Sequence, residues 1–267
     1  MSVGRIFDVK EFAVHDGPGA GITVFLKGCP LRCVWCHNPE GQRFERELMF
    51  KGALCTHCGA CVRDRESEDF RAWGRNISAC PRGLLSICGE DVTPRQIAER
   101  ILPLKNILDM MEGGVTFSGG EPLAYADFVC ETAELLHEHG IRTAMESCGY
   151  ATEETFLRVL SHMDYVMMDI KLMDAAEHKQ YTGVSNEPIL RNARLLMESG
   201  VPFVFRTPLI PQITDTEKNL AAIRDFVGDS PWETLPYNSL AGAKYPMLGR
   251  EFPYDATIKT ENKGEQI

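Results

Sequence analysis

Short apolar runs rich in β-branched and aromatic residues alternate with amphipathic stretches along most of the chain. The apolar runs predict strands at Ile22–Lys27, Val115–Phe117, Ile141–Glu146, Tyr165–Ile170, Phe203–Leu209 and Trp232–Tyr237. The amphipathic stretches predict helices at Tyr125–His139, Glu153–Ser161, Pro188–Ser199 and Thr216–Val227. Strands that alternate with helices pair in parallel through right-handed crossovers. About six such units predict an α/β fold, a partial (β/α)6 barrel of the TIM type with its chemistry at the C-terminal strand ends.

Residues 51–90 interrupt this alternation. The segment is rich in cysteine and charged in its middle, and its apolar residues follow neither a strand nor a helix period. So short a segment cannot bury enough apolar surface to fold by itself, and we expect a small metal-stapled, ferredoxin-like insert. The sequence thus predicts two units: residues 1–50 and 91–267 form the partial barrel, and residues 51–90 form the insert.

Composition and charge narrow the classes of function. Of the 267 residues, 44% are hydrophobic and 25% are charged, as in ordinary soluble globular proteins. A formal net charge of −10 argues against nucleic acid as a partner, because phosphate binding requires a basic face. The sequence shows neither an apolar run long enough to span a bilayer nor a signal peptide at its N-terminus. We expect a cytoplasmic monomer without a membrane partner.

The ten cysteines carry most of the chemical information, and seven of them lie within residues 29–80. In a reducing cytosol, closely spaced cysteines are more often metal ligands than disulfide partners. Cys29, Cys33 and Cys36 have C-x3-C-x2-C spacing, so one loop can bind three irons of a 4Fe–4S cubane and leave the fourth open. An open coordination site is typical of catalysis rather than of structure. The alternative is a structural zinc with His37 as its fourth ligand.

A second cysteine group lies in the insert and comprises Cys55, Cys58, Cys61 and Cys80. A compact triplet followed by a remote Cys80-Pro81 is a ferredoxin-type pattern and favours one auxiliary 4Fe–4S cluster. Four thiolates suit zinc equally well, and Cys88 is the alternative to Cys80 as the fourth ligand. We expect Cys130 and Cys148 to be free thiols packed within the fold.

The segment FLKGCPLRCVWCHNPEG, residues 25–41, resembles the signature of the radical S-adenosylmethionine (SAM) enzymes that activate glycyl radical enzymes, of the pyruvate formate-lyase activating enzyme type. The resemblance continues in HDGPG (15–19), GGVTFSGGEPL (113–123), ESCGY (146–150), MMDIK (167–171) and LPYN…GAKY (235–245). It implies an oxidoreductase whose cluster cleaves SAM reductively into methionine and a 5′-deoxyadenosyl radical. This radical would abstract a hydrogen from a backbone glycine of a partner glycyl radical enzyme.

The resemblance also implies which residues bind SAM. The SGGEP glycines allow close approach to the backbone and Glu121 offers a charge for an ammonium group; in the family this motif holds the SAM amino group. The matching Lys171 would lie near the methionine carboxylate, and Trp35 near the adenine. The full set of implied cofactor-binding residues is Trp35, His37, Asn38, Gly119, Gly120, Glu121, Glu146, Ser147, Asp169, Lys171 and Arg206. Some members bind a monovalent cation through the matching acidic residues. The alternatives are an ordinary glycine-rich turn for SGGEP, ordinary polar strand ends for the residues at 146–147 and 169–171, and a surface ion pair for Arg206.

The HDGPG motif is implied to face the partner. The resemblance places His15 and Asp16 near the glycine-bearing peptide, and the alternative is a solvated turn. The family usually continues with Ile-Arg-Thr, whereas Ala20, Gly21 and Ile22 follow here, so the arginine for an ion pair at that point is missing.

The charged loop at residues 62–79 is expected to dock a flavodoxin or ferredoxin reductant, or part of the partner enzyme, through Arg63, Arg65, Arg71 and Arg75. Electron-transfer encounters are steered by charge. The alternative is a solvated surface loop.

Two other functions stay open. A radical SAM enzyme acting on a small molecule or a peptide would use the same cofactors. A non-enzymatic iron–sulfur electron carrier would explain residues 51–90 but would leave the three-cysteine loop and SGGEP without a use. SAM cleavage after reduction separates an enzyme from a carrier, and the sequence leaves open which glycyl radical enzyme is activated.

Overall fold

The centre of the fold is an eight-stranded sheet. The computed structural model describes residues 2–254, and its strands are ordered β10-β9-β8-β7-β6-β2-β1-β5. The parallel strands are β2 (Gly21–Leu26), β6 (Val115–Gly119), β7 (Thr143–Ser147), β8 (Tyr165–Asp169), β9 (Phe203–Leu209) and β10 (Trp232–Pro236). Strands β1 (Gly4–Ala13) and β5 (Glu90–Val92) extend the β2 edge in antiparallel orientation. The predicted strands are confirmed in order, and the fold is an α/β partial barrel.

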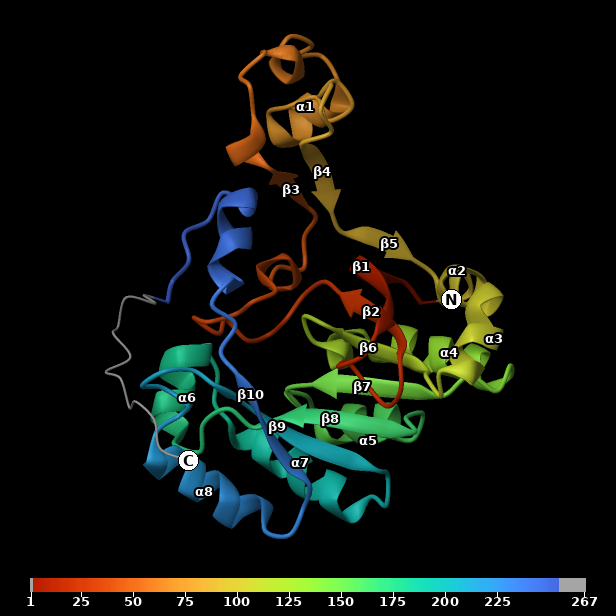
Figure 1. The fold of residues 1–267 in the computed structure, drawn as a ribbon, viewed down its shortest axis with the longest axis vertical. Helices are drawn as coiled ribbons and strands as arrows, with labels where there is room; N and C mark the ends of the chain where they lie inside the picture. Colours follow the sequence, from red (N-terminus) through yellow and green to blue (C-terminus); the bar gives the residue numbers. More distant parts are fainter. Residues whose placement is uncertain (1, 255–267) are drawn as a thin grey trace.

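Helices cover the outer face of the sheet (Figure 1). Helices α4 (Ala126–His137), α5 (Glu153–Leu160), α7 (Glu187–Glu198) and α8 (Glu217–Val227) lie where the sequence predicts them. The hydroxyls of Thr152 and Thr216 accept hydrogen bonds from first-turn N–H groups of α5 and α8, which a helix start otherwise leaves unpaired. Phe156 of α5 shares one buried core with Phe117 and Phe205 of the strands.

Four shorter helices were not predicted: α1 (Glu68–Trp73), α2 (Pro94–Ile101), α3 (Lys105–Met110) and α6 (Ala175–Thr182). They are six to eight residues long, so each offers only about two turns of periodic signal. Side-chain N-caps mark three of them: Ser67 for α1, Thr93 for α2 and Asp174 for α6. Thr93 and Gln96 form a reciprocal capping box at the start of α2.

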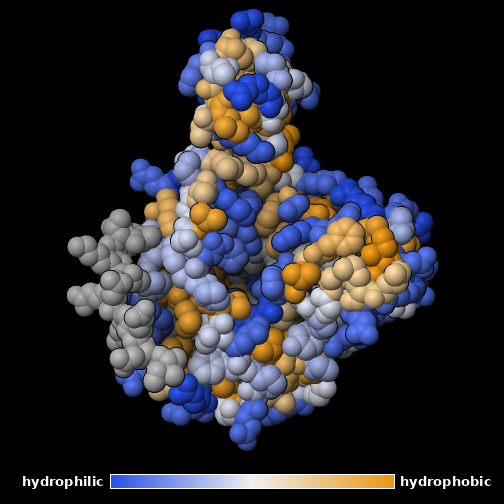
Figure 2. Space-filling model, viewed as in Figure 1, coloured by the Kyte–Doolittle hydropathy of each residue, from blue (hydrophilic) through white to orange (hydrophobic). Residues whose placement is uncertain are grey.

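A two-stranded antiparallel ribbon, β3 (Glu47–Phe50) and β4 (Leu85–Cys88), carries the insert. The chain between these strands forms a separate lobe above the barrel in Figure 1, and Figure 2 shows hydrophilic and hydrophobic residues intermixed on it. The ribbon brackets the cysteine-rich segment, while the expected unit boundaries at residues 50 and 91 stay a prediction. Within residues 2–254, no helix has both the length and the apolar character needed to cross a bilayer.

Candidate active site

The first cysteine group opens into a pocket at the C-terminal ends of the parallel strands, here called the C-terminal pocket. Its volume is about 250 Å³, and Cys29, Cys33 and Cys36 line it together with the ends of β6, β7 and β8. Nine of the eleven residues implied to bind SAM also line it: Trp35, His37, Asn38, Gly119, Gly120, Glu146, Ser147, Asp169 and Lys171. The structure thus gathers them at the end of the barrel where such folds carry their chemistry.

The SGGEP glycines let the cysteine loop lie against β6. A Cβ on Gly120 would come within 2.2 Å of the Gly28 carbonyl oxygen and 2.5 Å of the Gly41 carbonyl oxygen. Gly119 has a φ of +109°, and a Cβ there would lie 2.5 Å from the main-chain N and O atoms of Leu26. Only glycine tolerates both the close approach and the positive φ, so this turn positions the loop as well as lining the pocket.

The opposite side of the cysteine loop is held by the end of α6. The N–H groups of Arg32 and Val34 donate to the carbonyl oxygens of Thr182 and Tyr181 at 2.7 and 3.0 Å. Trp35 is buried, and its ring packs against Tyr181 with centroids 6.5 Å apart. The loop is therefore bonded on both sides by the barrel.

The three thiols form a donor set that fits a 4Fe–4S cluster. Burial raises the pKa of Cys33 and raises the pKa of Cys36 to about 11, whereas a hydrogen bond with Cys148 lowers the pKa of Cys29. Thiolates are the metal ligands, so iron would stabilise the form that burial disfavours. The described residues contain no three His, Cys, Asp or Glu side chains close enough for a single metal ion. Cubane ligands lie further apart than that, because the cluster stands between them.

Acidic and basic side chains lie beside the three thiols in the C-terminal pocket. Lys171, 9% exposed, forms an ion pair with Asp169. Burial alone would lower the pKa of Lys171, but Asp169 and Cys33 outweigh it and raise that pKa above its ordinary value, so Lys171 stays a cation. Glu146 accepts a hydrogen bond from Ser118 Oγ at 2.5 Å, and burial followed by the charge of Asp169 raises the pKa of Glu146. This mixed set of charges suits a ligand with both an ammonium and a carboxylate group.

Comparison with known proteins identifies the family. Residues 23–222 match the model of the radical SAM superfamily. The chain is 36% identical to the indoleacetate decarboxylase activating enzyme of Tractidigestivibacter scatoligenes, over 92% of this chain and 87% of that one. It is 34% identical to the choline trimethylamine-lyase activating enzyme of Oleidesulfovibrio alaskensis, over 94% and 88% of the two chains. The chain belongs to the radical SAM superfamily.

Within that superfamily the chain is a glycyl radical enzyme activating enzyme, as its motifs predict. The superfamily assignment brings a 4Fe–4S cluster and SAM as cofactors. The fold is also that of SuiB from Streptococcus suis, solved with its precursor peptide SuiA, with a TM-score of 0.52 and 14% identity over 85% of this chain and 40% of that one. At that identity the likeness concerns the fold alone.

Two residues implied to bind SAM do not line the C-terminal pocket of the activating enzyme: Glu121 and Arg206. Glu121 is fully buried behind the pocket wall, where burial raises its pKa. Its carboxylate accepts hydrogen bonds from Ser147 Oγ at 2.6 Å, Cys148 N at 2.8 Å and Leu123 N at 3.1 Å. Glu121 therefore holds the end of β7 in place, and its direct contact with the SAM amino group stays a prediction.

The sequence did not predict that Cys148 and Tyr237 line the C-terminal pocket. Cys148 is buried, as expected of a packed thiol, yet it lines the pocket beside Cys29. Tyr237 lines the pocket as well, and its hydroxyl has no hydrogen-bond partner among the described residues although the oxygen is buried. Both lie inside motifs of the resemblance, Cys148 in ESCGY and Tyr237 in LPYN.

The C-terminal segment fastens the cysteine loop from outside. In the 3-10 segment Ala241–Leu248, the Tyr245 hydroxyl donates to the Cys36 carbonyl oxygen at 3.0 Å. Lys244 Nζ donates to Asn38 Oδ1 at 3.1 Å and to Glu40 Oε1 at 2.5 Å. The loop that carries the three cysteines therefore depends on residues more than two hundred positions away.

A buried ion cluster joins this segment to the base of the insert. Glu47, the first residue of β3, accepts hydrogen bonds from Lys27 Nζ at 2.8 Å and from the Arg250 guanidinium. Lys27 is fully buried and also donates to the Glu40 carbonyl oxygen at 2.7 Å. Cys88 lies at the same place, with its thiol 3.7 Å from that carbonyl oxygen.

The second cysteine group lies in the lobe beyond the ribbon. Main-chain N–H groups of His57 and Leu84 donate to the sulfurs of Cys55 and Cys80 at 3.3 and 3.4 Å. Hydrogen bonds from the main chain of residues 84, 82 and 83 lower the pKa of Cys80. N–H donors directed at sulfur are a feature of iron–sulfur ligation. Cys80 has such donors and Cys88 is buried at the base of the insert, and which of the two is the fourth ligand stays a prediction.

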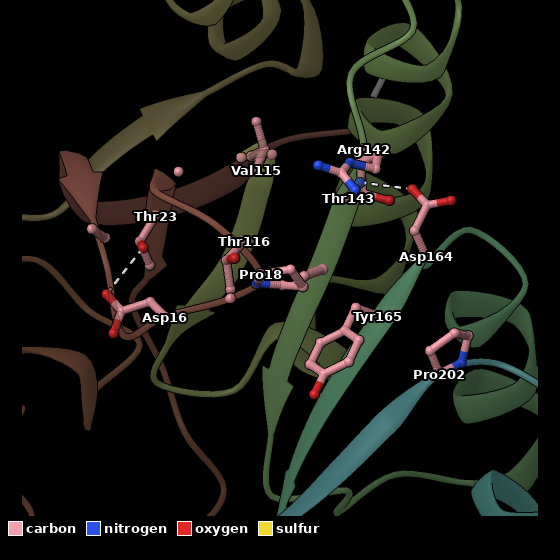
Figure 3. Close-up of a pocket in the computed structure, with 16 residues that line it drawn as sticks. Asp16, Pro18, Thr23, Val115, Thr116, Arg142, Thr143, Asp164, Tyr165 and Pro202 are labelled. Atoms are coloured by element: carbon pink, nitrogen blue, oxygen red, sulfur yellow. Dashed lines mark hydrogen bonds between the residues drawn. The ribbon is translucent and has the colours of Figure 1, made fainter. Parts of the chain in front are cut away.

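A second pocket, here called the N-terminal pocket, lies at the starts of the parallel strands and has a volume of about 360 Å³ (Figure 3). Asp16 and Thr23 lie on one side of it, and Tyr165 and Pro202 on the other. Thr23 Oγ donates to Asp16 Oδ2 at 3.0 Å. Asp16 lines this pocket and His15 does not, and the contact of either residue with a partner peptide stays a prediction.

Proposed function

We propose that this activating enzyme holds its catalytic cluster through Cys29, Cys33 and Cys36 and binds SAM in the C-terminal pocket. The convergence of three thiols and the charged strand ends on one pocket supports this assignment. When bound, the reduced cluster supplies the electron that splits SAM into methionine and a 5′-deoxyadenosyl radical, which abstracts a hydrogen from a backbone glycine of the partner. The chain's own residues orient SAM, exclude water and admit one glycine loop.

The pocket residues divide this work. Lys171, oriented by its ion pair with Asp169, would bind the SAM carboxylate, and Trp35 would pack at the adenine. The resemblance also implies a monovalent cation at Glu146 and Asp169. Glu146 is already paired with Arg206, and Asp169 with Lys171, so a bound cation would compete with these two side chains. Asp16 would meet the glycine loop at the N-terminal pocket, which it lines, and His15 would meet it beside that pocket.

The test is activation itself. Reconstituted, reduced enzyme is mixed anaerobically with SAM and with candidate partners drawn from decarboxylases, dehydratases, C–N and C–S lyases and formate-producing acyltransferases. We expect 5′-deoxyadenosine together with a glycyl radical signal in electron paramagnetic resonance with one of them. SAM cleavage without a glycyl radical in any partner would favour a small-molecule or peptide substrate. Failure to cleave SAM at all would favour a non-enzymatic iron–sulfur electron carrier.

We also propose one auxiliary 4Fe–4S cluster held by Cys55, Cys58, Cys61 and Cys80. We expect about eight irons per reconstituted chain, and about four after Cys58→Ala, because the two clusters use separate ligands. Iron, sulfide and zinc analysis measures this, and the spectral change on adding SAM to the variant shows whether the catalytic cluster persists. About four irons with one zinc per wild-type chain would contradict the auxiliary cluster.

The reductant is proposed to be a flavodoxin or ferredoxin, and we expect the enzyme to be a cytoplasmic monomer. Three of the four insert arginines that would dock the reductant also form hydrogen bonds within the insert. Arg63, Arg71 and Arg75 donate to Cys58 O at 3.2 Å, Glu66 O at 2.6 Å and Cys61 Sγ at 3.3 Å. They therefore also hold the lobe together.

A further inference from the structure

The two pockets lie on the same concave face of the sheet. Three strands line both of them: Thr116, Ala144 and Tyr165 line the N-terminal pocket, and Ser118, Glu146 and Asp169 line the C-terminal pocket. Alternate residues of a strand face the same side, and each pair is separated by an even number of positions. The pockets are therefore the two ends of one lumen.

Arg206 joins these two ends without lining either pocket. Its side chain, on β9, is 11% exposed. Nη1 donates to Glu146 Oε1 at 3.3 Å, in the wall of the C-terminal pocket, and Nε donates to Glu233 Oε1 at 2.6 Å. Nη2 donates to the carbonyl oxygen of His15 at 3.2 Å. One guanidinium thus connects the proposed SAM site to the HDGPG loop.

The HDGPG loop is packed tightly where Arg206 holds it. His15 directly precedes Asp16, which lines the N-terminal pocket and is bonded to Thr23. A Cβ on the next residue, Gly17, would lie 2.7 Å from the hydroxyl oxygen of Thr116. The position of Asp16 therefore depends on Thr23 and Thr116 on one side and on the bond from Arg206 to His15 on the other.

We propose that Arg206 is a positioning residue for the partner's glycine loop: it anchors the HDGPG loop at the N-terminal pocket instead of binding SAM. This inference rests on the proposed function, in which the partner meets His15 and Asp16. Two carboxylates, Glu146 and Glu233, neutralise and orient the buried guanidinium, which leaves Nη2 directed at the loop. A lysine carries the charge but cannot reproduce three donors in a planar fork.

The test compares Arg206→Lys, Arg206→Met and Glu233→Gln with the wild type. Arg224→Gln is the matched control, because Arg224 lies on α8 over the Trp232 ring, away from both pocket linings. Hydrogen exchange of the reconstituted enzyme reports on residues 14–20. We expect exchange there to rise about tenfold in Arg206→Met and less in Arg206→Lys and Glu233→Gln, because one buried hydrogen bond holds the loop. The control should match the wild type.

Binding measurements on the reconstituted enzyme separate the two possible roles. We expect the KM for the partner to rise about tenfold or more in Arg206→Met while the SAM dissociation constant changes less than about threefold, since Arg206 lines no part of the SAM pocket. Weaker SAM binding by about tenfold with unchanged loop exchange would overturn the inference and make Arg206 a SAM ligand. If Arg206→Met does not fold, Arg206→Lys and Glu233→Gln decide by the same readouts. If the proposed function is wrong, the wild type itself forms no glycyl radical, so this outcome is distinct from a failure of the inference about Arg206.

Discussion

Replacing Cys33 by alanine is expected to abolish SAM cleavage. Cys33 is the middle thiol of the loop, and losing one of the three thiolates removes an iron ligand of the catalytic cluster. Cys148 lies beside Cys29, but it comes from the end of β7, whose position Glu121 holds through the Cys148 N–H. We therefore expect the variant to keep about four irons, those of the auxiliary cluster, and to form no detectable 5′-deoxyadenosine with dithionite.

The control for this experiment is Cys130→Ala. Cys130 is a buried thiol of α4 that lines neither pocket, so its removal perturbs packing without touching the cluster. We expect iron content and SAM cleavage close to wild type. Continued formation of 5′-deoxyadenosine by Cys33→Ala would show that the catalytic ligands have been assigned to the wrong residues.

Replacing Glu47 by alanine is expected to destabilise the protein by about 3–5 kcal/mol, the usual cost of leaving buried partner charges unpaired. Lys27 is fully buried and the Arg250 side chain is 13% exposed, and both direct cationic nitrogens at the Glu47 carboxylate. The loss should appear as a lower midpoint in urea unfolding of the cluster-free protein. The Glu90–Arg100 pair, which is exposed, gives the control, because Glu90→Ala should cost at most about 1 kcal/mol.

The same ion cluster predicts a pH dependence with a definite sign. Burial would raise the pKa of Glu47, but the hydrogen bonds from Lys27 and Arg250 outweigh it and lower that pKa. A carboxyl group with a depressed folded-state pKa stabilises the fold at neutral pH, and this stabilisation is lost as the pH falls through that pKa. The difference in stability between wild type and Glu47→Ala should therefore shrink in acid. A constant difference across that range would mean that packing, not charge, accounts for the effect.

Features carried by near neighbours in the chain were predictable from sequence alone. Cys29, Cys33 and Cys36 stand on one loop, so their spacing by itself implies a shared site. The six parallel strands are short buried runs separated by long helical patterns, and crossover rules then dictate their pairing. The strand-end residues Glu146 and Asp169 meet the cysteine loop for the same reason, since parallel strands bring their C-terminal ends to one edge.

Only the tertiary structure decided what each charged side chain contacts. Glu121 looked free to bind an ammonium group, but its oxygens are used by Ser147 and by main-chain N–H groups behind the wall. Arg206 contacts the carbonyl of His15, 191 positions away, which its sequence context does not reveal, and Arg250 contacts Glu47 across 203 positions. Periodicity and spacing predict contacts between residues that are near in the chain or on adjacent elements. The direction of a long side chain depends instead on which distant donor or acceptor the packing brings within about 3 Å.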